Sequence, residues 1–244
     1  MSMLAGNVAM KLAFDGMFLG IYLWLHQFRL FDIGVDWSAA LLDLVAIDFV
    51  YYWFHRASHR VRILWAVHVN HHSSELMNFG TALRQPWLNR LVRPSFFWVL
   101  PIIGFHPFLT LTVGSIATIY GFWTHTEQIR TIGPLGWIFV SPSHHRVHHG
   151  SNPEYIDRNY GNLLIIWDRL FGTFAREDAP VVYGLRHNID SYNPLTIAFH
   201  DWSALLRGMR QAPSVSVALA LAFKPPGWTF EPDVPDQPDE PDQP

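Results

Sequence analysis

The sequence predicts an all-α protein: a bundle of membrane-spanning helices that carries a cap of helices rich in histidine. Three observations predict this class. The chain of 244 residues is half hydrophobic and only 15% charged, whereas soluble domains are roughly a quarter charged. Three long apolar runs are near the length that spans a bilayer. Most of the 14 histidines lie in clusters with helical spacing.

The first two apolar runs cover residues 4–25 and 38–54. Lys11 and Asp15 interrupt the first run, so it lacks the pattern of a cleaved secretory signal, and we expect it to be the first helix of the folded protein. Asp43 and Asp48 lie inside the second run. Carboxylates are costly in a bilayer, so a soluble bundle whose core contains these runs is the alternative interpretation.

The third apolar run covers residues 95–124 and has no formally charged residue. Pro101, Gly104 and Pro107 divide it into a shorter and a longer half. Because proline and glycine interrupt helices, this run predicts a kinked span or a membrane hairpin.

The charges between the runs predict the orientation. Residues 26–37 carry one Arg and two Asp, whereas residues 55–93 carry six Arg and one Glu. Loops rich in Lys and Arg stay on the cytoplasmic side, so the second segment, and the histidine cap to which it belongs, is expected to face the cytoplasm.

The end of the chain differs in composition from the rest. The last twenty residues hold six acids and no base, and residues 1–224 carry 17 basic and 14 acidic residues. Repeated prolines among acids cannot bury enough apolar surface to fold. We therefore expect one membrane domain over residues 1–228 and a disordered tail over 229–244.

The histidine clusters are the strongest functional signal. One HxxxH motif follows the second apolar run, and the pattern HxxHH occurs twice. A helix brings residues three and four apart to one face, so each motif can present its imidazoles together. Ser141 suits the N-cap of the second triplet, Pro142 its first turn and Gly150 its end. The eight motif histidines are His55, His59, His68, His71, His72, His145, His148 and His149.

Eight imidazoles exceed the three or four that a zinc ion takes, so their number predicts two ions with four or five nitrogen ligands each. His125, where the longest apolar run ends, is a ninth candidate ligand, and His144 is a possible one. Glu75 and Glu127 lie beside the motifs and are candidates to hydrogen-bond the outer nitrogen of a ligand imidazole. Imidazole suits zinc, copper, iron and nickel alike, so the ligand type leaves the metal open.

Several site classes are absent from the sequence. The chain has no cysteine, which excludes disulfides, thiolate zinc sites, cysteine-ligated iron-sulfur clusters and thiol nucleophiles. It has no Glu-x-x-His pair, no HExxH, no Walker loop and no GxGxxG. Its basic residues form no stripe, so nucleic acid is not an expected partner.

The histidine motifs in an apolar chain resemble those of the fatty acid hydroxylase superfamily, integral-membrane di-iron enzymes that include sterol desaturases. The likeness covers roughly residues 40–190. It is most specific to the branch that cleaves alkylglycerol ethers, through an ordered string of five segments: residues 71–75, 81–85, 125–127, 141–150 and 157–174.

This resemblance implies two iron ions held by the eight motif histidines and His125, and hydroxylation of a lipid C–H bond with O2. The external reductant would be tetrahydrobiopterin, or a donor of the ferredoxin or cytochrome b5 type. In the alkylglycerol branch the hydroxylated carbon lies beside the ether oxygen. A sterol, carotenoid or fatty acyl hydroxylase or desaturase is the alternative within the superfamily.

Two other classes fit the same ligands. A histidine-rich protein for metal transport or storage would direct its ligands along a path across the bilayer. A dizinc lipid hydrolase would need neither oxygen nor reductant. Arg84, Gln85 and Arg146 are candidates for contact with a lipid headgroup.

Overall fold

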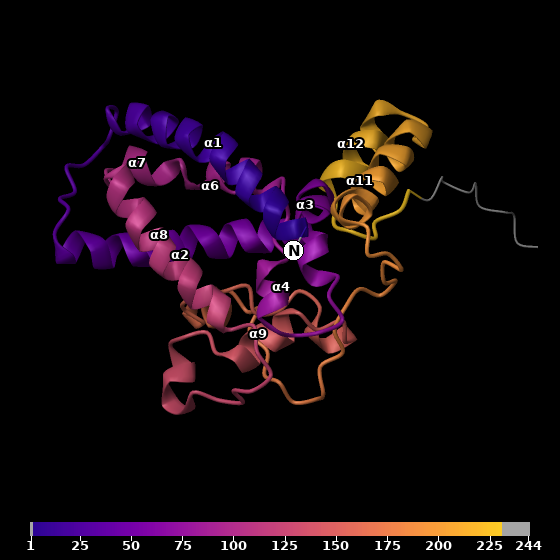
Figure 1. The fold of residues 1–244 in the computed structure, drawn as a ribbon. Helices are drawn as coiled ribbons and strands as arrows, with labels where there is room; N and C mark the ends of the chain where they lie inside the picture. The colour runs from indigo at the N-terminus through magenta and orange to yellow at the C-terminus, as the bar shows by residue number, and fades with distance from the viewer. Residues whose placement is uncertain (1, 231–244) are drawn as a thin grey trace, which may run out of the picture.

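The computed structural model describes residues 2–230, and within that range it is all-helical, as predicted, with isolated β-bridges but no strand. Figure 1 shows the long helices α1, α2 and α8 together on one side and the short helix α9 below them. The elements in chain order are α1 (Ser2–His26), α2 (Trp37–Arg60), α3 (Arg62–His72), α4 (Phe79–Leu83), α5 (Asn89–Val92), α6 (Pro94–Phe97), α7 (Val99–Ile103), α8 (Pro107–Trp123), η1 (Gly133–Trp137), α9 (Pro142–His148), η2 (Pro153–Tyr155), α10 (Ile166–Leu170), α11 (Pro194–Gln211) and α12 (Val215–Phe223).

Helices α1 and α2 form from the first two apolar runs, and both are long and apolar enough to cross a membrane. In the most apolar window of α1 only 6% of the residues are buried, and in that of α2 33% are buried. A helix of a soluble core would instead hide its apolar side chains from solvent. The exposure of α1 therefore favours a membrane protein over the soluble alternative.

The third apolar run is a helical hairpin. The short helix α6 packs on α2 and α7 packs on α1, and after the turn α8 packs along α2. The turn lies at Gly104, which has a φ of 136° and leaves no room for a Cβ beside the carbonyl of Phe31. Of the two predicted forms, the hairpin is the one observed.

The core of the bundle lies between α1, α2 and the hairpin. It is built on the buried side chains of Tyr22, Ile47, Leu100 and Val113, with Phe97, Phe105 and Ala117. Asp43 faces this core and accepts a hydrogen bond of 2.9 Å from the Thr110 hydroxyl. A carboxylate in α2 is thus turned toward another helix rather than toward lipid, which is how polar groups are accommodated in spans.

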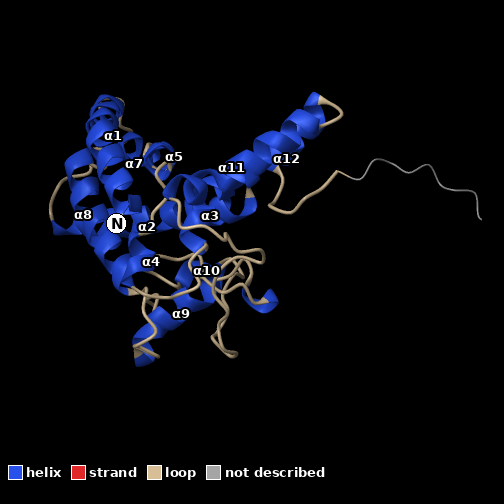
Figure 2. Cartoon of the chain, turned by 45° about the vertical axis from the view of Figure 1, so that its right-hand side comes forward, coloured by secondary structure: helices blue, strands red, loops and turns tan. Residues whose placement is uncertain are grey.

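The cap consists of α3, α4, α9, α10 and the loops between them, and it lies where α2 ends (Figure 2). Helices α11 and α12 form a second hairpin, which packs on α3 and extends away from the body in both views. Residues 231–244, the greater part of the predicted tail, lie outside the described residues.

Candidate metal centre

Three helices and the turn after α8, which holds His125, supply the candidate ligands. Helix α2 continues past its apolar part through His55 and His59, as its spacing predicts, and ends at Arg60. Helix α3 carries the first triplet in its last two turns. Helix α9 carries the second triplet, with its C-cap at His149. The Ser141 hydroxyl accepts a hydrogen bond from the His144 backbone N–H, which is the predicted N-cap.

The structure brings nine histidines together in two groups. Within each group one ring nitrogen from every residue lies within 4.8 Å of the others. The group of five is His55, His59, His68, His72 and His148, and the group of four is His71, His125, His145 and His149. All are buried except His59, which is half-buried. Each group can hold a metal ion.

The two HxxHH motifs divide between the groups in the same way. In α3 the pair His68 and His72 joins the group of five, while His71 joins the group of four. In α9 the pair at the same spacing joins the group of four, while His148 joins the group of five. Each triplet therefore contributes residues to both groups. The groups adjoin, since the rings of His72 and His149 stack at 4.4 Å between centroids.

The spacing of the facing nitrogens fits metal ligation. The Nε2 atoms of His55 and His72 each lie 3.1 Å from that of His68, and in the other group the facing pairs lie 2.9–3.2 Å apart. Nitrogens that bind one ion at about 2.1 Å are about 3 Å apart when they are adjacent at right angles. The Nε2 atoms of His59 and His148 are buried without a hydrogen-bond partner. A shared cation would satisfy these lone pairs.

Backbone carbonyls hold the outer nitrogens of three histidines. The Nδ1 atoms of His55, His125 and His148 lie 2.8, 2.9 and 3.0 Å from the carbonyl oxygens of Tyr160, Gly121 and Arg158. A carbonyl can only accept, so each Nδ1 carries the proton and each Nε2 keeps its lone pair toward the group.

The loop that supplies two of these carbonyls is itself held in place. Asp157 and Asn159 adopt positive φ values of 61° and 53°. The Asp168 carboxylate accepts hydrogen bonds from the backbone N–H groups of Tyr160 and Gly161. A few residues on, Asp48 of α2 accepts hydrogen bonds from the N–H groups of residues 163 and 164 and from the Trp167 indole. The carboxylate inside the second apolar run thus ties the cap to the membrane helix.

Burial also prepares the imidazoles electrostatically. Loss of hydration, and secondarily the charges of neighbouring histidines, hold the pKa of six cap histidines well below its usual value: His68, His71, His72, His145, His148 and His149. Burial likewise lowers the pKa of His125 to about 4. These rings are neutral near pH 7, which is the state in which a nitrogen binds metal.

Three other predicted residues lie apart from the two groups. The Nδ1 atom of His144 accepts a hydrogen bond from the Ser141 N–H, as part of the helix cap. Glu75 and Glu127 are exposed, and among the described residues neither is hydrogen-bonded to a histidine of either group. The hydrogen bonds to outer imidazole nitrogens that were expected from these glutamates are made by backbone carbonyls instead.

Arg146 is also not available to a lipid headgroup. Its side chain is buried, and its guanidinium forms two hydrogen bonds with Glu177 and two with the carbonyls of Thr126 and Ile129. No sequence pattern predicted this pairing, or Tyr160 and Arg158 as carbonyl partners. One feature of the sequence did indicate a buried polar contact near this loop: Asp48 interrupts an apolar run.

The fold and the site together define the class of this protein. It is an all-helical membrane protein whose cap buries two adjoining groups of histidines, each of them a candidate metal site. The model of the fatty acid hydroxylase family matches residues 40–173, and the chain belongs to that family. No solved structure matches the chain at a significant level.

Curated relatives agree with this assignment. The chain is 43% identical to human alkylglycerol monooxygenase over 213 residues and 42% identical to the Xenopus tropicalis protein of that name over 210 residues. Each match covers 85% of this chain and 46% of the relative, so the chain spans about half the length of these proteins. Ornithine lipid hydroxylase OlsE of Rhizobium tropici is 32% identical over 141 residues, which is 57% of this chain and 43% of OlsE.

Proposed function

We propose that this chain is a membrane-bound di-iron monooxygenase that inserts one oxygen atom of O2 into a lipid C–H bond. The observation that carries the proposal is the division of nine histidines into two adjoining, buried groups. One ion per group accounts for the nine facing nitrogens. The names of the relatives, monooxygenase and hydroxylase, favour a redox metal over zinc.

The bound ions would supply the activation of O2 and the transfer of its electrons. The carbonyls of Tyr160, Gly121 and Arg158 each accept a hydrogen bond from the Nδ1–H of a ligand histidine. The Nε2 atom of that histidine therefore has no proton and can bind an ion. The buried ring of Tyr160, which lies 5.3 Å from the ring of His59 and 6.0 Å from that of His55, helps to keep water away from the group of five. Exclusion of water limits side reactions of a reactive oxygen species.

For the substrate, we infer an alkylglycerol, hydroxylated on the carbon beside its ether oxygen. This follows from the identity to alkylglycerol monooxygenases over 85% of the chain. One oxygen atom would enter the C–H bond and the other would leave as water, so the reaction needs two electrons and two protons from a reductant. Tetrahydrobiopterin is the reductant we propose. The hemiacetal product would collapse to an aldehyde and glycerol.

We place the metal groups on the cytoplasmic side of the membrane. Helix α2 carries exposed apolar side chains, which we expect to face lipid, and at its C-terminal end it carries His55 and His59. The groups therefore lie where this helix leaves the bilayer, within reach of an alkyl chain. The excess of arginine in residues 55–93 supports a cytoplasmic location for this end.

The test is metal analysis combined with oxygen uptake. The chain would be purified in detergent after growth with iron, and its metals identified and counted by plasma mass spectrometry. Oxygen uptake would then be measured with an alkylglycerol and tetrahydrobiopterin. The matched control is the acylglycerol of the same chain length, which lacks the C–H bond beside an ether oxygen. A ferredoxin or cytochrome b5 would replace the pterin in a parallel assay.

We expect about two irons per chain and oxygen uptake that requires both the ether and the pterin. Uptake with a fatty acyl or sterol substrate in place of the ether would contradict the proposed substrate and leave the reaction class standing. Two zincs, with no oxygen use after iron reconstitution, would overturn the monooxygenase in favour of a hydrolase or a binding protein.

A further inference from the structure

A polar hollow lies on the side of α9 away from the two histidine groups. His145, His148 and His149 face the groups, whereas His144 lines this hollow, which has a volume of about 310 Å³. Arg130, Arg169 and Arg176 line it too, together with Trp137 and Phe174. We call it the arginine hollow.

The charge of the arginine hollow is unbalanced. Among the described residues none of its three arginines has an ion-pair partner. Of the two acids in its wall, Glu177 is bound by Arg146 at 2.8 and 2.6 Å, which leaves Asp178 against three cations. The hollow therefore carries an excess of positive charge, which favours an anionic ligand.

Arg169 is the most confined of the three arginines. Its guanidinium carbon lies 3.9 Å from the centre of the Phe174 ring and 4.7 Å from that of Trp137. These contacts restrain the side chain and so reduce the entropy that it loses when it binds a ligand. Its Nε atom is buried and has no hydrogen-bond partner. A buried donor without a partner is costly, and a charge-assisted hydrogen bond from the same guanidinium to an anion would offset part of that cost.

The arginine hollow borders a surface of exposed apolar side chains. Leu135, Trp137 and Ile138 of the η1 segment are 58%, 62% and 50% exposed, and Leu170, next to Arg169, is 69% exposed. Exposed apolar side chains beside cations are the pattern of a protein surface that meets the headgroup region of a bilayer.

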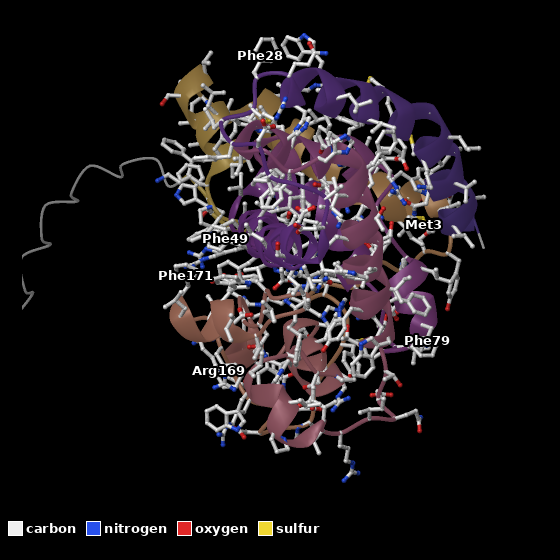
Figure 3. The ribbon with its side chains drawn as sticks, turned by 90° about the vertical axis from the view of Figure 1, so that its left-hand side faces the viewer. Met3, Phe28, Phe49, Phe79, Arg169 and Phe171 are labelled. Atoms are coloured by element: carbon white, nitrogen blue, oxygen red, sulfur yellow. The ribbon has the colours of Figure 1, made fainter. Side chains whose placement is uncertain are left out.

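Contacts with α2 place this surface beside the membrane helix. Phe171 stacks on Tyr52 at 5.3 Å and lies near Phe49 of the same helix. Figure 3 shows Phe49 and Phe171 together, with Arg169 below them on the same side of the molecule. Phe49 and Tyr52 lie within two turns of His55, near which we place the exit of α2 from the bilayer. Helix α10 therefore lies close to that exit.

We propose that the arginine hollow binds the phosphate group of a membrane phospholipid, with the acyl chains of the lipid lying against Trp137, Ile138 and Leu170. Arg130, Arg169 and Arg176 bind the phosphate oxygens. This site is separate from the histidine groups, and the proposal does not depend on the metal or on the reaction.

The test uses the full chain in a neutral detergent and three soluble probes. These are dioctanoyl phosphatidic acid, dioctanoylglycerol, which lacks the phosphate, and inorganic phosphate, which lacks the acyl chains. Binding would be measured by native mass spectrometry and thermophoresis. The variants are Arg169→Gln, Arg176→Gln and Trp137→Gln. Arg210→Gln, an exposed arginine of α11, is the matched control.

We expect phosphatidic acid to bind about tenfold more weakly to Arg169→Gln and to Arg176→Gln, since each loses a charge-assisted hydrogen bond, and to bind Arg210→Gln as it binds the unchanged chain. Trp137→Gln should weaken binding of phosphatidic acid more than binding of inorganic phosphate, because it removes an acyl-chain contact as well as the ring that restrains Arg169. Because Arg176 is exposed, its variant remains informative if Arg169→Gln fails to fold.

Three outcomes would overturn the proposal. Unchanged binding of phosphatidic acid by both arginine variants would exclude the hollow as the site. Equal binding of dioctanoylglycerol would show that the acyl chains alone are recognised. Inorganic phosphate that binds as tightly as the lipid, with no effect of Trp137→Gln, would identify a site for free phosphate instead.

Discussion

At the scale of single residues, the protonation of each ring decides whether the two histidine groups can bind metal. A neutral imidazole has one nitrogen with a proton and one without, and only the second is a ligand. The carbonyls of Tyr160, Gly121 and Arg158 settle this choice for three rings. Glutamates would do the same with a charge, and here the backbone does it without adding charge to a buried site.

Each triplet contributes to both groups, but no residue belongs to both, so removal of one ligand should weaken one site and leave the other intact. We expect His148→Ala, in the group of five, and His71→Ala, in the group of four, each to lower the metal that remains after a chelator wash from about two ions to about one per chain. The measurement is plasma mass spectrometry on protein of equal purity. His200→Ala is the control, since His200 lies outside both groups and contacts the Ile197 carbonyl. Two ions in His148→Ala would contradict the assignment.

The spacing of the motifs was enough to predict eight of the nine histidines, and the end of the longest apolar run predicted His125, but neither predicted how the nine divide. HxxHH places three rings on one face of a helix, and a single ion for all three is equally compatible with that spacing. The division between groups depends on the angle at which α3 and α9 meet, which only tertiary packing determines. His144 has the same i, i+4 relation to His148 as a ligand would have, yet it serves the helix cap.

At the scale of elements, the segment of residues 157–174 supplies two of the three carbonyls that orient ligand histidines, those of Arg158 and Tyr160. Its apolar residues follow no helical or strand periodicity, so its conformation could not be predicted from the sequence. Its shape comes from two residues at positive φ and from buried carboxylates that replace regular backbone pairing. By contrast, the helices α1, α2, α8 and α9 were predictable, because apolar length, proline and a serine cap act locally.

Asp168 should be the residue on which this loop depends most. One of its oxygens accepts from the Tyr160 N–H and the Thr173 hydroxyl, and the other from the Gly161 N–H. In Asp168→Asn one oxygen becomes an amide that faces a donor. We expect a loss of about 2 kcal/mol in the free energy of unfolding and about tenfold weaker metal binding, because the Tyr160 carbonyl no longer holds His55.

The first effect would be measured by thermal unfolding in detergent and the second by competition with a metal chelator. Asp190→Asn, at an exposed position, makes the same change of charge and should alter neither quantity. Asp168→Asn protein that unfolds more easily yet binds metal with unchanged affinity would show that the loop stabilises the fold without positioning His55.

At the scale of the whole molecule, the bundle and the cap are connected through α2. Its first half faces the hairpin through Asp43 and Thr110, and its second half is enclosed by the cap through Asp48 and the aromatic contacts of Phe171. The two aspartates that made a soluble core conceivable are thus explained in a membrane helix, because each is turned toward protein.

This arrangement makes the orientation of the chain testable. The loop of residues 27–36 and the cap lie at opposite ends of α2, so they must face opposite sides of a membrane that α2 crosses. The chain has no cysteine, so single cysteines can be introduced at Val35 and at Glu154, both exposed.

In right-side-out bacterial vesicles, an impermeant maleimide should label Val35→Cys and not Glu154→Cys, because the arginine-rich end stays in the cytoplasm. Inverted vesicles should give the reverse pattern. Labelling of Glu154→Cys from outside would place the cap on the other side, and labelling of both positions from the same side would show that α2 does not cross.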